Sequence, residues 1–423
     1  MADLPVPRSP EDFEAGAALA RRIAGEAIWS GSLCAFHGAS AAPRLGDPAL
    51  HLAFGGDLYE GSAGIARFLA LAARLTGEAG LRAAALGAAR HALARSEGWS
   101  LFSGRLGTGL AVLEVAERLG EAELVPPAIE AVELASEEAL GEAAEVGPYD
   151  LLSGISGVIS GLLAALPYDL DGGWRTRAFD LGRALLKGAA DDGTGWSWPL
   201  HPEQPERLCG LAHGASGAAL ALEALGRLAV GEAGWPEAAA KARAFERAWF
   251  AAEPSSWADL RSDVRRESGG ALVYPHMWCH GSVGIAAERI SLARSDDLLG
   301  RSDAVAGLAG AAAEASRIVA GAAGAGAGDH ANASQCHGLS GMAELFIDAY
   351  AVDPDPEWIA LARAATAFVR NDSLRPGGWR CGIPGGAWTP GLMLGGAGIG
   401  WAQFRAWDPV AVGSCWRLSL SPS

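Results

Sequence analysis

Two cysteines of this chain stand in almost the same short sequence context. Trp-Cys-His-Gly occupies residues 278–281, and Cys-His-Gly recurs at 336–338, so that a cysteine lies two residues before a glycine in both places. Two thiols and at least one imidazole from equivalent positions are donors that Zn²⁺ prefers. The pattern therefore predicts a zinc site that includes Cys279 and Cys336. The alternative is that both cysteines are small buried apolar residues, as free cysteine often is.

The glycines of these motifs belong to a longer repeat. The repeat has seven copies, whose Gly-x-x-Gly motifs begin at Gly61, Gly104, Gly154, Gly214, Gly281, Gly338 and Gly395. The intervals of 43 to 67 residues have the length of a helical hairpin with variable loops. An apolar stretch follows each motif, and a more amphipathic stretch, such as 238–249 or 358–369, lies between motifs. Each repeat is therefore predicted to contain one buried helix and one outer helix.

Composition agrees with an all-α fold, because the 423 residues include 58 Gly, abundant Ala and few β-branched runs. Neither end shows the polar capping repeat that an open solenoid needs, so we predict a closed α/α toroid around a central cavity. Residues 1–50 are predicted as an N-terminal helical segment and 51–423 as the toroid. The N-terminal helix should begin at Ser9 and run to Trp29, with irregular chain from 31 to 51.

The chemically active residues lie just before the glycine motifs. In a closed ring of equivalent hairpins these positions fall at the same end of the inner helices and converge on one mouth of the cavity. That convergence brings together Asp150, His213, Cys279, His280, Cys336 and His337. Helix N-termini carry partial positive charge, which lowers thiol pKa and favours the thiolate that a metal requires.

Charge and segment patterns exclude several classes of function. The formal charge of −16 and a pI near 5.0 argue against a nucleic-acid partner and are compatible with a cationic or neutral peptide. Six widely spaced cysteines show no dense disulfide framework, which indicates a reducing compartment. The N-terminal residues do not have the pattern of a secretory signal, and no transmembrane segment is predicted. We therefore expect a cytoplasmic protein.

These motifs resemble those of the LanC-like lanthionine cyclases. The resemblance extends from about residue 58 to about residue 403. The most specific pieces are Tyr-Asp-Leu at 149–151, Gly-Leu-Ala-His-Gly at 210–214 and the two cysteine motifs. The resemblance implies a double ring of seven inner and seven outer helices. It implies that Cys279, Cys336 and His337 bind zinc, and that Asp150 and His213 are the acid/base candidates.

The chain departs from that family's pattern at two positions. His280 stands where some stand-alone cyclases have tyrosine, and the variant looks more like cyclase domains fused to dehydratases or kinases. His280 is therefore a third candidate catalytic residue. Pro275 stands where some members have an arginine, so the arginine partner implied for Asp150 is missing from its usual place.

The resemblance implies a lanthipeptide cyclase. Such an enzyme adds peptide cysteine thiols to dehydroalanine or dehydrobutyrine in a dehydrated precursor peptide, which a separate dehydratase supplies; a transporter is a further candidate partner. His213 is the first candidate to relay the proton, because histidine titrates near working pH, and Asp150 would orient it. The alternatives are a helix-end histidine satisfied by backbone and an aspartate that caps a helix.

Three other functions use some of the same features. A LanC-like enzyme could add glutathione or another small thiol to dehydroamino acids in proteins with the same zinc chemistry. A toroidal glycoside hydrolase would need paired carboxylates, and only Asp150 stands out at the converging positions. A non-catalytic zinc-binding protein that binds peptides would keep the motifs without the reaction.

Overall fold

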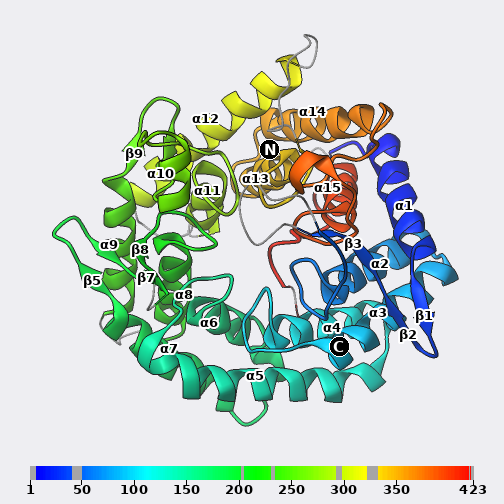
Figure 1. The fold of residues 1–423 in the computed structure, drawn as a ribbon, viewed down its shortest axis with the longest axis horizontal. Helices are drawn as coiled ribbons and strands as arrows, with labels where there is room; N and C mark the ends of the chain where they lie inside the picture. The colour runs from blue at the N-terminus through cyan, green and yellow to red at the C-terminus, as the bar shows by residue number, and fades with distance from the viewer. Residues whose placement is uncertain are drawn as a thin grey trace.

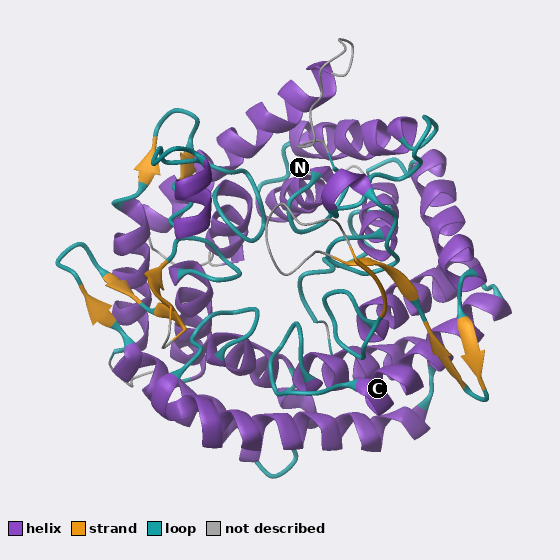
Figure 2. Ribbon diagram, in the orientation of Figure 1, coloured by secondary structure: helices purple, strands orange, loops and turns teal. Residues whose placement is uncertain are grey.

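The computed structural model describes residues 6–40, 50–201, 204–229, 234–291, 298–321, 332–418 and 420. Its helices form two concentric rings, which Figure 1 shows in a view down the ring axis. Figure 2 shows that the strands are short hairpins attached to these rings. The predicted α/α toroid is confirmed.

The inner ring is built from the helices that begin directly after the Gly-x-x-Gly motifs' first glycines. They are α2 (Ser62–Thr76), α4 (Arg105–Leu119), α6 (Ile155–Ala164), α8 (Ala215–Leu228), α11 (Ser282–Ser291), α13 (Leu339–Val352) and α15 (Gly396–Trp407). Each contacts the next, and α15 contacts α2. The ring is closed. Helices such as α2 and α15 are buried on nearly all sides, which suits their apolar sequences.

The outer ring packs against the inner ring in pairs. Its helices are α1 (Pro10–Gly25), α3 (Ala79–Arg95), α5 (Val125–Val146), α7 (Gly173–Gly188), α9 (Trp235–Arg247), α12 (Leu298–Gly321) and α14 (Pro356–Asp372). Six of them pack on the inner helix that precedes them in sequence, whereas α1 packs on α15. The N-terminal helix α1 therefore pairs with the last inner helix, α15, where the ring closes (Figure 1).

The remaining elements of the described chain are short. They are β1 (Ile28–Ser30), β2 (Leu33–Ala35), β3 (His37–Ser40), β4 (Leu50–Ala53), β5 (Ala190–Asp191), β6 (Trp196–Ser197), β7 (Pro199–His201), β8 (Gln204–Arg207), β9 (Phe250–Ala251), β10 (Ser256–Trp257), α10 (Ser262–Glu267), and the 3₁₀ turns Ala122–Leu124, Leu166–Tyr168 and Pro384–Gly386. The strands pair in antiparallel hairpins, β1 with β2, β3 with β4, and so on. None of the helices within the described ranges is both long and apolar enough to cross a membrane.

The prediction for residues 9–51 was right for the helix up to residue 25 and wrong for residues 28–40 and 50–51, whereas 41–49 lie outside the described residues. The Ser9 hydroxyl accepts a hydrogen bond from the Asp12 amide at 3.4 Å and caps α1, as expected. The helix ends at Gly25, however, and residues 28–40 form strands rather than helix and irregular chain. The reason is tertiary. Strand β2 buries Cys34, whose thiol donates to the Ala84 carbonyl of α3 at 3.3 Å, and such burial outweighs weak local propensity.

The second glycine of each motif is required by a close backbone approach. In every repeat a Cβ at this position would lie only 1.6 to 2.6 Å from the carbonyl oxygen of the residue six positions earlier. The positions are Gly64, Gly107, Gly157, Gly217, Gly284, Gly341 and Gly398. Glycine at this position therefore allows each loop to fold back against the first turn of its own inner helix. Packing explains this glycine in all seven repeats.

A closed circle of backbone hydrogen bonds joins the loops that precede the inner helices. The equivalent residues, two positions before each first glycine, are Tyr59, Phe102, Leu152, Ala212, Cys279, Cys336 and Met393. The N–H of each, or in one loop that of Trp278, donates to the carbonyl of the equivalent residue in the next loop at 2.8 to 3.4 Å. The Met393 N–H donates to Tyr59 at 2.9 Å and completes the circle. We call these seven loops the loop belt.

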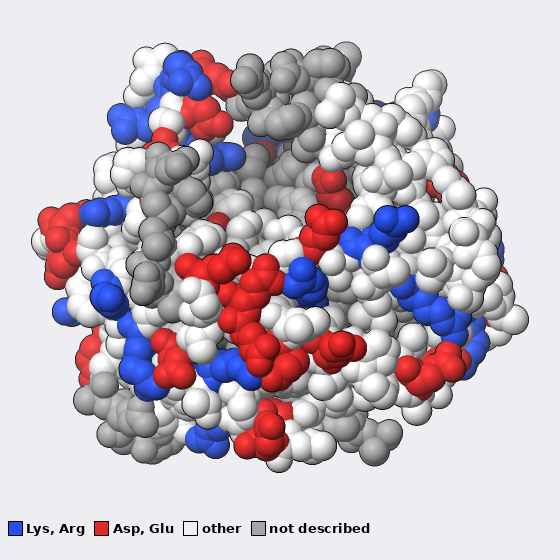
Figure 3. Space-filling view, turned by 60° about the horizontal axis from the view of Figure 1, so that its bottom comes forward, with Lys and Arg blue, Asp and Glu red and all other residues white. Residues whose placement is uncertain are grey.

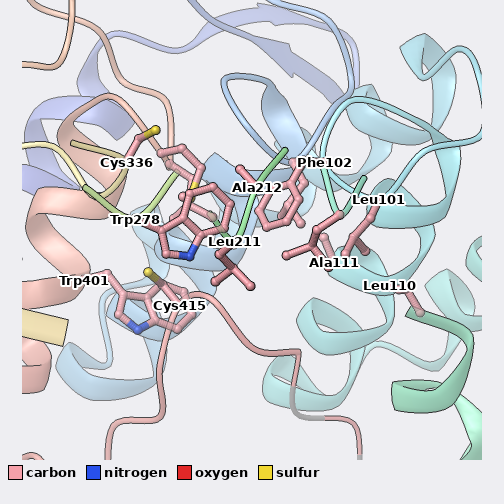
Figure 4. Packing of buried hydrophobic residues seen from close by; sticks show 14 of the residues in the cluster. Leu101, Phe102, Leu110, Ala111, Leu211, Ala212, Trp278, Cys336, Trp401 and Cys415 are labelled. Carbon is pink, nitrogen blue, oxygen red and sulfur yellow. The ribbon is translucent and has the colours of Figure 1, made fainter. Parts of the chain in front are cut away.

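The C-terminal residues support the belt from within the ring. Arg67 of α2 donates to the carbonyls of Cys415 and Arg417, both at 3.0 Å. Trp401 of α15 donates to the Gly413 carbonyl at 2.9 Å. The segment thus places the Trp416 ring 6.4 Å from that of Trp278, the residue before Cys279. Figure 4 shows the buried packing around Trp278, Trp401 and Cys415.

A substitution at a second glycine tests the origin of the repeat. Gly107→Ala should lower the free energy of unfolding by about 3 kcal/mol, because its Cβ would lie 1.6 Å from the Leu101 carbonyl oxygen. Gly141→Ala, on outer helix α5 with open space around the added carbon, is the matched control. It should leave stability equal or raise it by up to about 1 kcal/mol. Denaturant unfolding followed by circular dichroism measures both, and equal effects would contradict the packing explanation.

Candidate active site

Four of the seven belt residues, Tyr59, Leu152, Cys279 and Cys336, line a cavity of about 730 Å³. All six residues predicted to converge line this cavity: Asp150, His213, Cys279, His280, Cys336 and His337. They come from four different repeats and meet because each lies close to the belt position of its loop. Tyr59, Arg261 and a set of apolar residues, Pro148, Leu152, Leu200 and Leu208, complete much of the wall.

The two cysteines touch each other. Their side chains are hydrogen-bonded to each other. This hydrogen bond and the positive charges of Arg261 and His213 lower the pKa of Cys279 below that of an ordinary thiol. Burial of the Cys279 side chain acts in the opposite direction but is outweighed. The pKa of Cys336 is raised well above its usual value by the same hydrogen bond and by burial. Cys336 is thus the thiol that donates, and Cys279 is the sulfur that becomes a thiolate first. The Tyr59 hydroxyl also hydrogen-bonds to Cys336.

His337 lies in the same cavity and is oriented by backbone. Burial lowers the pKa of its ring, and a hydrogen bond to the Gly382 backbone partly opposes this. A side chain at Gly382 is excluded, because its Cβ would lie 2.9 Å from the His337 Nε2 atom. A neutral imidazole that is held by backbone through one nitrogen keeps the lone pair of the other, which is the usual arrangement of histidine ligands to metals.

The donors fit zinc in kind. Two thiols in contact and a neutral imidazole in one cavity are the ligand types of catalytic zinc sites with three protein ligands. Across the part of the chain that the structure describes, however, no three Cys, His, Asp or Glu side chains gather closely enough to hold a metal ion. The two sulfurs are in place, and a third donor would have to move closer to them. The predicted ligand set thus stays a prediction.

Asp150 and His213 form a hydrogen-bonded pair. The Asp150 Oδ2 atom lies 2.7 Å from His213 Nδ1, and its Oδ1 atom accepts from the Ser153 amide at 2.7 Å. Both alternatives considered from sequence are therefore wrong. Gly154, not Asp150, is the N-cap of α6, and His213 is held by a carboxylate rather than by backbone.

This pairing controls the proton of His213. Burial alone lowers the pKa of the ring, but the hydrogen bond and charge of Asp150, together with the charge of Cys279, outweigh it and raise the pKa above its ordinary value. When Nδ1–H of His213 donates this hydrogen bond to Asp150, Nε2 is the ring nitrogen that remains available. His213 can therefore hold a proton near neutral pH and transfer it from Nε2.

His280 has a different character from His213. The two rings stack with centroids 5.8 Å apart, but His280 is only 2% exposed and its Nδ1 atom lies 3.5 Å from the Cys209 carbonyl oxygen. Burial, reinforced by the charge of Arg261, lowers the pKa of His280 to about 3. The ring is neutral at working pH. It can orient His213 or a substrate but cannot store a proton as His213 can.

Two residues of the cavity wall whose side chains could take part in chemistry, Tyr59 and Arg261, were not predicted from sequence. Tyr59 occupies the belt position of the first repeat, so alignment of the seven loops could have found it. Arg261 lies between β10 and α10, outside every repeated position. Its sequence neighbours carry no signal that would have placed it beside Cys279.

Comparison with known proteins agrees with this architecture. Residues 53–412 match the family of lanthionine synthetase C-like proteins. The chain belongs to this family. Nisin cyclase, which is 17% identical, has a similar structure with a TM-score of 0.61, covering 87% of this chain and 92% of that chain. At this identity the likeness concerns the fold.

Weaker structural likenesses come from other enzymes. The GH76A alpha-1,6-mannanase from Salegentibacter sp. HEL1_6 is 12% identical, with a TM-score of 0.46 over 94% of this chain and 99% of that one. Cellobiose 2-epimerase from Spirochaeta thermophila DSM 6192 is 15% identical, with a TM-score of 0.42 over 95% of this chain and 98% of that one. No curated protein sequence matches the chain. The assignment to the lanthionine synthetase C-like family therefore rests on the match over residues 53–412.

The Asp150–His213 pair can be tested by titration. Asp150→Asn should lower the pKa of His213, because it removes the charge and the hydrogen bond that raise it. NMR titration of the metal-free protein measures this, with His213→Asn identifying the resonance. Asp180→Asn, which removes a surface carboxylate paired with Arg183, is the control and should leave the value unchanged.

The raised pKa of His213 also makes the free energy of unfolding depend on pH. Because the folded-state pKa of His213 is raised, its protonation stabilises the fold below the pKa of an unfolded histidine, and this stabilisation is lost as pH rises through the folded-state value. Asp150→Asn should weaken that dependence. An unchanged His213 pKa in Asp150→Asn would show that the pair does not control the proton.

Proposed function

We propose that this chain is a zinc-dependent lanthipeptide cyclase. It would add cysteine thiols of a dehydrated precursor peptide to dehydroalanine or dehydrobutyrine residues and so form lanthionine and methyllanthionine rings. The observation that carries the proposal is the meeting of a touching thiol pair and a carboxylate–histidine pair in one cavity of a lanthionine synthetase C-like fold. Nisin cyclase, a cyclase by name, shares that fold.

The metal would be held by Cys279, Cys336 and His337. When bound, zinc would supply a Lewis-acidic position at which a substrate thiol loses its proton. Tyr59 would keep the Cys336 sulfur oriented, because its hydroxyl is bonded to that atom. Gly382 would do the same for the His337 ring. Tyr59 and Gly382 would thus orient these two zinc ligands before a substrate binds.

The addition moves one proton in all, from the substrate thiol to the α-carbon, while an electron pair of sulfur forms the new C–S bond and the C=C π pair is displaced. The sulfur of the substrate thiolate forms a bond to the β-carbon, and the C=C π electrons move to the carbonyl group as an enolate. The α-carbon then takes a proton, which restores the amide. His213 is placed to give that proton from Nε2, because Asp150 holds Nδ1 and stabilises the charged ring. The proton lost by the substrate thiol replenishes His213.

The surroundings of the site suit a peptide. The cavity wall combines the polar groups with the apolar residues Pro148, Leu152, Leu200 and Leu208, so that it can accept backbone and apolar side chains together. Asp and Glu side chains gather over the middle of the face shown in Figure 3, in keeping with the net charge of −16. A cationic or neutral peptide is therefore favoured over an acidic one.

A glycoside hydrolase reaction is disfavoured by the same wall. Among the described residues that line the cavity, Asp150 is the one carboxylate, and it is engaged by His213. Hydrolysis of a glycosidic bond ordinarily requires two carboxylates that flank the bond. The addition of a small thiol such as glutathione would use the same residues as cyclisation, so the substrate assay below includes it.

Metal analysis tests the first part of the proposal. Protein purified without added metal should contain about one zinc per chain by elemental analysis, and Cys279→Ala should lose it, because two remaining ligands are too few for a tight site. Cys34→Ala removes a buried cysteine near α3 and is the matched control, which should keep its zinc. Well-folded wild-type protein with almost no zinc would refute zinc dependence.

Turnover tests the second part. His213→Asn should keep the zinc while enzyme-dependent cyclisation slows by about 10²-fold or more. The probe is a synthetic peptide with one dehydroalanine and one cysteine, in which free thiols are counted by alkylation and mass spectrometry. His51→Gln, at an exposed position of β4, should cyclise like wild type. Addition of glutathione in preference to the peptide's own cysteine would favour the small-thiol reaction, and a wild-type rate in His213→Asn would move the proton transfer to another group.

A further inference from the structure

Arg261 is the one arginine or lysine among the described residues that line the cavity. It is held in place on one side only. The Arg261 Nε atom donates to both oxygens of Asp259 at 3.0 and 3.2 Å, and Nη2 donates at 2.6 Å. Asp259 is itself 2% exposed, and its amide donates to the Val273 carbonyl at 2.8 Å. The guanidinium is therefore anchored to a buried residue whose backbone is itself hydrogen-bonded.

This anchoring leaves hydrogen-bond donors available. A guanidinium has five N–H groups, and Asp259 takes those on the edge formed by Nε and Nη2. Nη1 has no hydrogen-bond partner among the residues that the structure describes, and about a third of the side chain is exposed, at 36%. The free edge of a guanidinium in a cavity wall is a ready donor pair for an oxygen atom of a ligand.

Arg261 also lies within electrostatic reach of both halves of the site. Its charge acts on Cys279 in the thiol pair, on His213 in the proton-transfer pair and on His280 between them. A substrate that bridges the thiol pair and His213 would pass beside it. None of the other polar groups in the described wall carries a permanent positive charge at working pH, since His280 is neutral and His213 gives up its proton during the reaction.

The proposed reaction creates a negative charge that these groups do not neutralise. When the sulfur bonds to the β-carbon, the electron pair of the C=C bond moves to the carbonyl oxygen of the dehydroamino acid. The charge stays there until the α-carbon takes its proton from His213. Preorganised donors aimed at such an oxygen are usually among the largest contributions to catalysis.

Resting on the proposed function, we infer that Arg261 is a further catalytic residue, whose free guanidinium edge binds the carbonyl oxygen of the dehydroamino acid and stabilises the enolate. Asp259 is its positioning residue, because it fixes the opposite edge. The chain would thus supply a cation from the segment before α10, although position 275, where some relatives have arginine, holds Pro275.

The test compares three variants with the dehydroalanine peptide described above. Arg261→Gln should lower kcat by about 10² to 10³-fold, while zinc content and KM stay near wild type. Arg261→Lys should recover only part of the rate. Lysine keeps the positive charge but lacks the planar guanidinium that can bind Asp259 with one edge and the substrate oxygen with the other. Arg266→Gln removes a neighbouring exposed charge on α10 and should behave like wild type.

A second readout separates catalysis from folding. Wild type should exchange the α-hydrogen of the lanthionine product with deuterium from D₂O by reversal through the enolate, and Arg261→Gln should lose this exchange in parallel with kcat. Asp259→Asn/Arg261→Gln removes both charges, so that no carboxylate is left buried without its partner. If it melts like wild type, it should remain as slow as Arg261→Gln.

The outcomes distinguish this inference from the function on which it rests. A raised KM with unchanged kcat and exchange in Arg261→Gln would overturn the enolate role in favour of simple substrate binding. Unchanged kcat and KM would overturn it entirely while leaving the cyclase proposal intact. A wild-type protein that neither cyclises the peptide nor exchanges the α-hydrogen would overturn both.

Discussion

The circle of backbone hydrogen bonds in the loop belt is the constraint on which the rest of this structure depends. Each loop donates an amide proton to the next, and Met393 returns the chain of bonds to Tyr59. Buried backbone groups of this kind must find partners, so a missing repeat would leave two of them without one. The belt also explains the glycine motif, because each loop can reach its neighbours only by folding tightly against its own inner helix, as at Gly107.

The same circle assembles the chemistry. Cys279 and Cys336 touch because they occupy the belt position of consecutive loops, and Asp150 meets His213 because their loops are also consecutive. Burial and neighbouring charges then shift the pKa values of these side chains in different directions. The pKa is lowered for Cys279, raised for His213 and lowered for His280. Residues of the same type, such as His213 and His280, thus differ in pKa because burial and the nearest charge differ for each.

Both ends of the chain take part in holding the belt. Helix α1 packs on α15, which brings the first and last parts of the chain together at the point of closure. Beneath the belt, Arg67 fixes the C-terminal segment, and Trp416 lies against Trp278, the residue that precedes Cys279. The site is therefore coupled to contacts between residues more than 300 positions apart, such as Arg67 with Cys415. This coupling is expected of a closed ring and not of an open solenoid, in which repeats contact only their neighbours.

Repetition is what made the sequence informative. Seven equally built motifs determined the helical hairpins and their closure, and a common position relative to Gly281 and Gly338 was enough to predict that the two cysteines meet. The tertiary structure alone decided what lies outside the repeat. Strands at residues 28–40 form because β2 is buried against α3, and Arg261 reaches the cavity because Asp259 anchors it in a loop with no counterpart in other repeats. A sequence repeat reveals the positions that recur in every repeat. A contact that occurs only once depends on packing between distant segments, so no repeated sequence pattern indicates it.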